Sequence, residues 1–121
     1  MKIRDILNKD TATISFEVFP PKKSTDFGNV EVAALGIAAL QPAYMSVTYG
    51  AGGSTKGHTI ALAEEIQKKH NVPTVAHLTC VCADRSSIGA ALTEMQAAGI
   101  ENILALRGDL PKDFDGEVFT D

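Results

Sequence analysis

The stretch SFEVFPPKK, residues 15–23, places a single acid, Glu17, between Phe16 and the pair Val18 and Phe19, just before two prolines. An unpaired carboxylate is costly to bury among apolar side chains. A carboxyl group in such a setting is therefore neutral, paired with another group, or used in chemistry. This acid is the first candidate for a functional residue.

Three further predicted strands carry polar or titratable residues toward their carboxyl ends. These residues are Thr48 and Tyr49, then His77 and Thr79, then Arg107 and Asp109. In α/β folds, functional sites are built at the carboxyl ends of the strands. Because all four strands share this pattern, we expect a site at one rim of the sheet. The alternatives are a core histidine bonded to the backbone for His77 and a surface ion pair for Arg107 and Asp109.

The glycine-rich segment GAGGSTKG, residues 50–57, follows the second predicted strand. From Gly50 it reads G-x-G-x-x-T, so it lacks the third glycine of a dinucleotide-binding fingerprint. Lys56 is also not preceded by the glycine that a phosphate-binding P-loop requires. A tight turn and an anion cradle formed by backbone N–H groups are about equally consistent with this segment.

A metal site built from His77, Cys80 and Cys82 is not expected. Side chains alternate along a strand, so His77 and Cys80 face opposite sides. A fourth ligand is missing, because His58 and His70 lie at opposite ends of a predicted helix. We expect the two cysteines to be inert thiols, and their spacing makes them a poor disulfide pair.

Four predicted strands alternate with three predicted helices along the chain. The strands span 13–19, 43–49, 73–80 and 102–108, and the helices span 24–41, 58–70 and 84–99. Short connections between alternating elements favour a parallel sheet with right-handed crossovers. Two α/β architectures fit this order: a small doubly wound open sheet, and the first half of a (β/α)₈ TIM barrel.

The composition is typical of a globular protein and narrows the classes of partner. The 121 residues are 45% hydrophobic and 21% charged, and we expect one domain over 1–121. A net charge of −4 leaves no basic surface for nucleic acid or anionic lipid. Neither a signal-type segment nor a long apolar run is present, so we expect a cytoplasmic protein without membrane contact.

Four stretches together resemble the methylenetetrahydrofolate reductase family, the flavin-dependent barrel enzymes of one-carbon metabolism. They are SFEVFPPK, YMSVTYGAGGST, AHLTCV and ILALRGDLP, in family order and at family-like spacing from Ile14 to Pro111. The resemblance implies that the chain is the first half of a TIM barrel. It also implies FAD as cofactor, NADH or NADPH as co-substrate, and reduction of 5,10-methylenetetrahydrofolate to 5-methyltetrahydrofolate.

The resemblance further implies roles for individual residues. Glu17 matches the general acid that protonates a folate nitrogen, so that the five-membered ring opens to an iminium. Its apolar neighbours suit that role, because they favour the uncharged acid. Asp109 matches a residue close to both the flavin and the folate. The positions that match contacts to the flavin and nicotinamide are Thr48, Tyr49, Ala51, His77, Arg107, Gly108 and Asp109.

The chain departs from the family in two respects. Val18 stands where the family usually has an aromatic residue, and we expect its side chain to face the helices. A complete barrel takes about 250 residues, so four strands alone would leave two open edges. We therefore expect a homo-oligomer, or a second chain that completes the barrel. Two other classes remain open: a half-barrel that binds flavin or folate without catalysis or serves as the scaffold half of a two-chain enzyme, and a flavodoxin-like or Rossmann-like nucleotide-binding domain.

Overall fold

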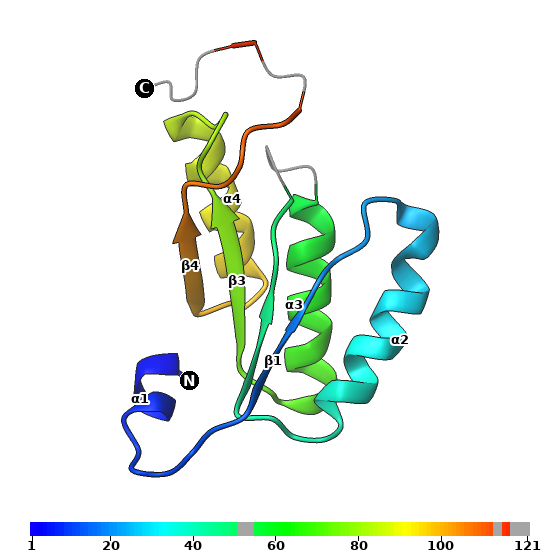
Figure 1. Ribbon diagram of the computed structural model, residues 1–121, viewed down its shortest axis with the longest axis vertical. Coiled ribbons are helices and arrows are strands. Elements are labelled where there is room, and N and C mark those ends of the chain that lie inside the picture. Colours follow the sequence, from blue (N-terminus) through cyan, green and yellow to red (C-terminus); the bar gives the residue numbers. More distant parts are fainter. Residues whose placement is uncertain (51–54, 113–114, 117–121) are drawn as a thin grey trace.

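The structure, a computed structural model, describes residues 1–50, 55–112 and 115–116. Four strands form one sheet (Figure 1). They are β1 (Ser15–Val18), β2 (Tyr44–Val47), β3 (Thr74–Thr79) and β4 (Asn102–Leu106). Each strand is shorter at its ends than the sequence predicts, but all four predicted strands are present.

The strands lie in sequential order, β1-β2-β3-β4, and each neighbouring pair is parallel. A doubly wound sheet would instead reverse its strand order at a switch point. The observed order therefore favours the half-barrel over the flavodoxin-like alternative, and the expected α/β fold with a parallel sheet is confirmed.

Three helices connect the strands, as predicted. They are α2 (Phe27–Ala38), α3 (Lys56–His70) and α4 (Arg85–Ala97). The predicted start of the first helix is replaced by a 3₁₀ turn, η1 (Ser24–Asp26), and α2 begins directly after it. Helix α4 begins with a capping box, in which the Asp84 side chain accepts a hydrogen bond from the backbone N–H of Ser87.

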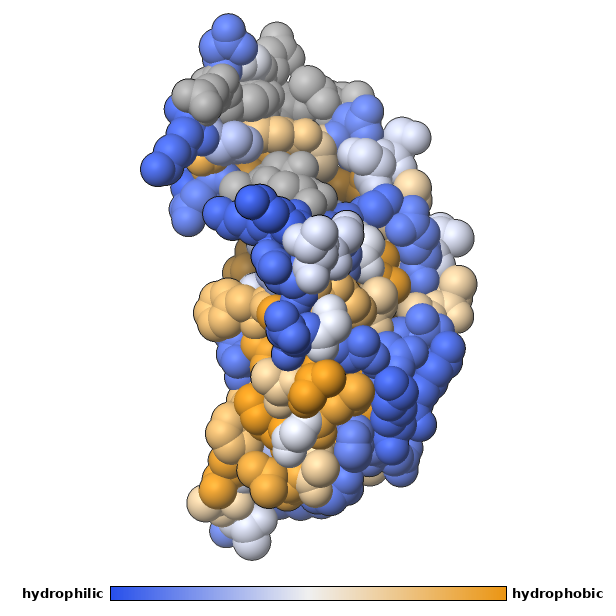
Figure 2. Space-filling model, turned by 90° about the vertical axis from the view of Figure 1, so that its right-hand side faces the viewer, coloured by the Kyte–Doolittle hydropathy of each residue, from blue (hydrophilic) through white to orange (hydrophobic). Residues whose placement is uncertain are grey.

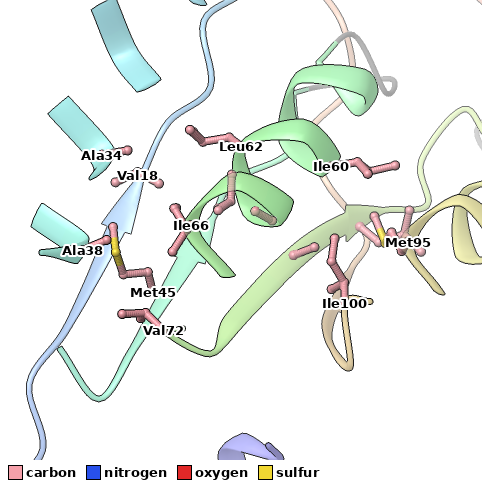
Figure 3. Close-up of a cluster of buried hydrophobic side chains, with 14 of the residues drawn as sticks. Val18, Ala34, Ala38, Met45, Ile60, Leu62, Ile66, Val72, Met95 and Ile100 are labelled. Atoms are coloured by element: carbon pink, nitrogen blue, oxygen red, sulfur yellow. The ribbon is translucent and has the colours of Figure 1, made fainter. Parts of the chain in front are cut away.

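The core lies between the helices and one face of the sheet (Figure 3). Met45 on β2 and Leu62 and Ile66 on α3 are each 0% exposed. Val18 belongs to this cluster, so the expectation that it faces the helices is confirmed. Burial of a side chain of this size stabilises the fold by about 1.5–3 kcal/mol. These contacts fix the sheet from one side only.

A short N-terminal helix, α1 (Ile3–Leu7), was not predicted. It lies below the amino end of β4 (Figure 1). The backbone N–H of Ile3 donates to Asn102 Oδ1 at 3.0 Å, and the Met1 ammonium pairs with Glu101. Five residues are too few to show a helical period or to form a helix alone. Contacts with the start of β4 explain why this helix is present.

The described sheet is bordered by β1 and β4, and apolar residues remain uncovered near both borders. Ile103, Leu104 and Leu106 of β4 are 37–43% exposed. The side of the molecule that carries α2 also shows apolar side chains gathered over its lower half (Figure 2). These uncovered borders agree with a sheet that belongs to a larger barrel. Within the described ranges, no helix has the length and apolar character needed to span a membrane.

Candidate functional site

The face of the sheet that points away from the helices carries both polar and apolar side chains. Alternation along the strands brings Glu17 of β1, Ser46 of β2 and His77 of β3 to this inner face. They line a hollow of about 440 Å³, which also includes Ser15, Tyr44, Val75 and Leu104. The structure therefore brings the predicted acid and the predicted histidine into one hollow, together with a serine that the sequence analysis did not single out.

Glu17 has two polar neighbours on the inner face. The register pairs Glu17 directly with Ser46 across β1 and β2. The Ser46 hydroxyl donates a hydrogen bond to Glu17 Oε2 at 3.0 Å. His77 Nε2 lies 3.4 Å from the same oxygen. The carboxyl group is thus hydrogen-bonded to Ser46 of β2 and approached, without a hydrogen bond, by His77 of β3.

Glu17 has apolar neighbours, since Phe16, Val75 and Leu104 line the same hollow, but they leave its carboxyl group open to water. The Glu17 side chain is 47% exposed. Val18 alternates away from it into the core, and Phe19 is 68% exposed. The adjacent residues in sequence therefore do not exclude water from the carboxyl group. Water can be excluded from the Glu17 carboxyl group only by groups that cover the inner face.

His77 and Thr79 are buried, with 8% and 7% of their surface exposed. Their Nε2 and Oγ1 atoms have no hydrogen-bond partner among the described residues. The structure therefore does not support the alternative interpretation of His77 as a core histidine satisfied by the backbone. Buried polar atoms without a partner are rare, because each loses its hydration. A bound polar group would satisfy such an atom.

Thr48 and Gly50 begin a loop that is anchored to the first turn of α3. The Thr59 hydroxyl donates to the Thr48 carbonyl at 2.8 Å, and the Gly50 N–H donates to Thr55 Oγ1 at 2.7 Å. The alternation that places Ser46 on the inner face also directs Thr48 there. Ala51, another predicted contact, lies outside the described residues.

Tyr49 lies on the other side of the sheet from Glu17. It packs against the core and lines a cavity of about 310 Å³ together with Lys56 and Ser87. Burial raises the pKa of the Tyr49 phenol, and the charge of Glu94 raises it further. Thr79, two residues after His77 on β3, lines this cavity as well, and the predicted contact of Tyr49 with a cofactor stays a prediction.

Arg107, Gly108 and Asp109 follow β4 and lie beside the end of β3. The pairing continues past both strands, with the Val81 N–H donating to the Arg107 carbonyl at 2.7 Å. Gly108 has a φ of +83°, and a Cβ atom there would lie 2.7 Å from the Thr79 Cβ. Only glycine fits this approach. Arg107 and Asp109 are exposed, and these two described residues form no ion pair with each other.

His58 was considered only as a metal ligand, and the structure gives it a different position. Its Nδ1 lies 2.7 Å from the Pro21 carbonyl and its Nε2 lies 3.2 Å from Ser24 Oγ. Its ring also lies 5.5 Å from that of Phe27. His58 thus ties the start of α3 to the loop that follows Glu17. Contacts across more than thirty residues leave no local signal in the sequence.

Both cysteines, Cys80 and Cys82, are free thiols. Within the ranges that the structure describes, no group of three or more His, Cys, Asp or Glu side chains is placed to hold a metal ion.

Comparison with known proteins identifies the family. The sequence model of the methylenetetrahydrofolate reductase family matches residues 2–120. The chain belongs to this family. It is 40% identical over 119 residues to methylenetetrahydrofolate reductase 2 of Schizosaccharomyces pombe, covering 95% of this chain and 19% of that protein. The match to methylenetetrahydrofolate reductase (NADH) 1 of Arabidopsis thaliana is 36% identical over 110 residues, covering 91% and 19%.

A bacterial relative shows the same coverage of this chain. The 5,10-methylenetetrahydrofolate reductase of Pectobacterium carotovorum is 32% identical over 116 residues, covering 91% of this chain and 39% of that protein. The chain therefore spans about a fifth of the length of the two eukaryotic reductases and about two fifths of the bacterial one. The sequential parallel sheet accords with the first half of the family's barrel.

Proposed function

We propose that this chain forms part of an enzyme that reduces 5,10-methylenetetrahydrofolate to 5-methyltetrahydrofolate, with Glu17 as the general acid. The observation that supports this most is the position of Glu17. It is held by Ser46 at 3.0 Å and approached by His77 at 3.4 Å, on the open inner face of a sheet from the reductase family. Carboxyl groups fixed by neighbouring side chains are suited to proton transfer.

The proposed proton transfer uses Glu17 in its acid form. Its O–H bond breaks and an N–H bond forms on the ring nitrogen of the folate, whose bond to the methylene carbon then breaks. The methylene carbon remains attached to the other nitrogen as an iminium and accepts a hydride. Glu17 is left as a carboxylate, and the exposure of 47% gives it a route to recover a proton.

A flavin fits the residues beside Glu17. The buried His77 Nε2 and Thr79 Oγ1 lack hydrogen-bond partners among the described residues, and Gly108 lets the segment after β4 pack closely against Thr79. Thr48, His77, Arg107, Gly108 and Asp109 would hold the group, which we propose is FAD. When bound, the flavin would carry hydride from the nicotinamide to the methylene carbon. Roles for Tyr49 and Ala51 stay predictions.

The reductant that we propose is NADH or NADPH. The names of the Arabidopsis relative and of the maize relative include NADH, which supports NADH for this chain.

We further propose that the uncovered borders at β1 and β4 are covered by the remaining strands of a barrel, supplied by further chain, a second copy or another subunit. The apolar residues exposed on β4 support this. The cytoplasmic location stays a prediction.

The test is Glu17→Gln in the whole gene product that contains these residues. Glutamine keeps the size and the hydrogen bond from Ser46 but cannot donate the proton. We expect folate reduction to fall by roughly 10²–10⁴-fold, while reduction of the flavin by the nicotinamide stays at the wild-type rate. Stopped-flow absorbance of the flavin follows both half-reactions.

The matched control is Glu64→Gln, which makes the same change on α3, where Glu64 pairs with Lys68. This variant should retain both half-reactions. If Glu17→Gln also retains both at wild-type rates, Glu17 is not the general acid. If the wild-type protein reduces no folate, the proposed reaction itself is wrong.

A further inference from the structure

Ser46 faces Glu17 because of the strand register. The two residues are direct partners in the parallel pairing of β1 and β2, and their side chains point to the same face. The distance of 3.0 Å from Ser46 Oγ to Glu17 Oε2 is that of a hydrogen bond in which the hydroxyl donates. A donor to a carboxylate forms a stronger bond than one between neutral groups.

The backbone on both sides of Ser46 is firmly fixed. Met45 and Val47 are 0% exposed and belong to the core. A side chain as short as serine has few rotamers, so its hydroxyl has little freedom relative to that core. Residues on packed strands position a functional group more accurately than residues on loops do.

The second neighbour of Glu17 approaches the same oxygen. His77 Nε2 lies 3.4 Å from Oε2 and is buried within the central strand β3. Both neighbours are thus directed at Oε2. Oε1 has no hydrogen-bond partner in the part of the chain that the structure describes. The two oxygens of one carboxyl group therefore have different surroundings.

From this asymmetry we infer that Ser46 is a positioning residue for Glu17. Its hydroxyl holds Oε2 as an acceptor, so the acidic proton is carried on Oε1. In the transfer the Oε1–H bond breaks and the N–H bond forms on the folate, while the bond from Ser46 to Oε2 is retained. This inference rests on the proposed function, because it specifies which oxygen of the proposed acid reacts.

The test compares Ser46→Ala with Ser46→Thr in the whole gene product. Alanine removes the hydroxyl, and threonine keeps it while its methyl group enters the hollow on the inner face. We expect Ser46→Ala to lower kcat for folate reduction by roughly tenfold to a hundredfold, because the lost hydrogen bond would stabilise the carboxylate that forms as the proton leaves. KM for the folate and the rate of flavin reduction should stay unchanged. Threonine should restore kcat to within about threefold of wild type.

The matched control is Ser86→Ala, the same change on the exposed first turn of α4. It should leave both half-reactions at wild-type rates. If Ser46→Ala behaves like this control in an active enzyme, the positioning role is wrong. It is also wrong if Ser46→Ala raises KM, slows flavin reduction and lowers thermal stability together, because those effects indicate a structural role.

A second measurement does not depend on turnover. NMR relaxation of the Glu17 side chain, in protein labelled with ¹³C at glutamate, reports how firmly the carboxyl group is held. We expect its order parameter to fall in Ser46→Ala but not in Ser46→Thr or Ser86→Ala. An unchanged order parameter overturns the inference. If the order parameter falls in Ser46→Ala while the wild-type protein reduces no folate, the positioning role is supported and the proposed reaction is wrong.

Discussion

The two faces of the same sheet differ in how far their side chains are exposed and in whether those side chains are apolar or polar. On the face toward the helices, Met45, Val47 and Ala76 are 0% exposed and fill a continuous core. On the inner face, their strand neighbours Ser46 and His77 surround a carboxyl group that is 47% exposed. Adjacent residues of one strand thus serve stability and chemistry separately. The two properties can therefore be changed independently.

The largest effect should come from the face toward the helices. Leu62 of α3 is 0% exposed, and Leu62→Ala would leave a cavity in the core. We expect it to lower the free energy of unfolding by about 2–5 kcal/mol. Urea denaturation followed by circular dichroism measures this change. Leu40→Ala, at a leucine that is 74% exposed, should change it by less than about 0.5 kcal/mol.

The inner face should respond in the opposite direction. Thr79 Oγ1 is buried without a partner among the described residues, so Thr79→Val removes an unsatisfied polar atom while keeping the shape. We expect this variant to raise the free energy of unfolding by up to about 1 kcal/mol. It should also weaken flavin binding, because the lost hydroxyl would contact the flavin. Urea denaturation and flavin fluorescence titration measure the two effects.

Thr59→Val is the matched control for this prediction. Thr59 is also buried, but its hydroxyl donates to the Thr48 carbonyl at 2.8 Å. Its replacement should lower the free energy of unfolding by about 1–3 kcal/mol, because the carbonyl loses its donor. Equal destabilisation by both variants would show that Thr79 is satisfied in the folded protein, and the contrast between the faces would fail there.

The sequence predicted the face toward the helices better than it predicted the inner face. Alternation and helical periodicity are local, so Val18 and the three helices could be placed from neighbouring residues alone. The bond between Glu17 and Ser46 depends on the register of two strands separated by a helix, and the sequence does not state that register. Helix α1 was missed for the same reason, since its contacts are with β4.

The packing of the Tyr49 side chain against the core also follows from alternation. Tyr49 comes directly after Thr48, so the two side chains point to opposite faces. A match to family motifs assigns consecutive residues to one site, whereas the pleat of the strand separates them. Alternation also contributes to the exposure of Glu17, because Val18 faces the core and leaves the carboxyl group accessible.

The smallest effect concerns the pH dependence of the face toward the helices. Burial raises the pKa of Tyr49 above its ordinary value of 10.0, with a further contribution from Glu94. The folded protein therefore retains this phenol proton to higher pH than the unfolded chain does. The resulting stabilisation is complete below pH 10 and is lost as the pH rises through the folded pKa.

Tyr49→Phe has no proton to lose, so its free energy of unfolding should fall less steeply with alkaline pH than that of wild type. Urea denaturation at a series of pH values from 8 to about 11 compares the two slopes. Identical slopes would show that the phenol has the same pKa in the folded and unfolded states. That result would contradict the prediction that burial raises the pKa of Tyr49.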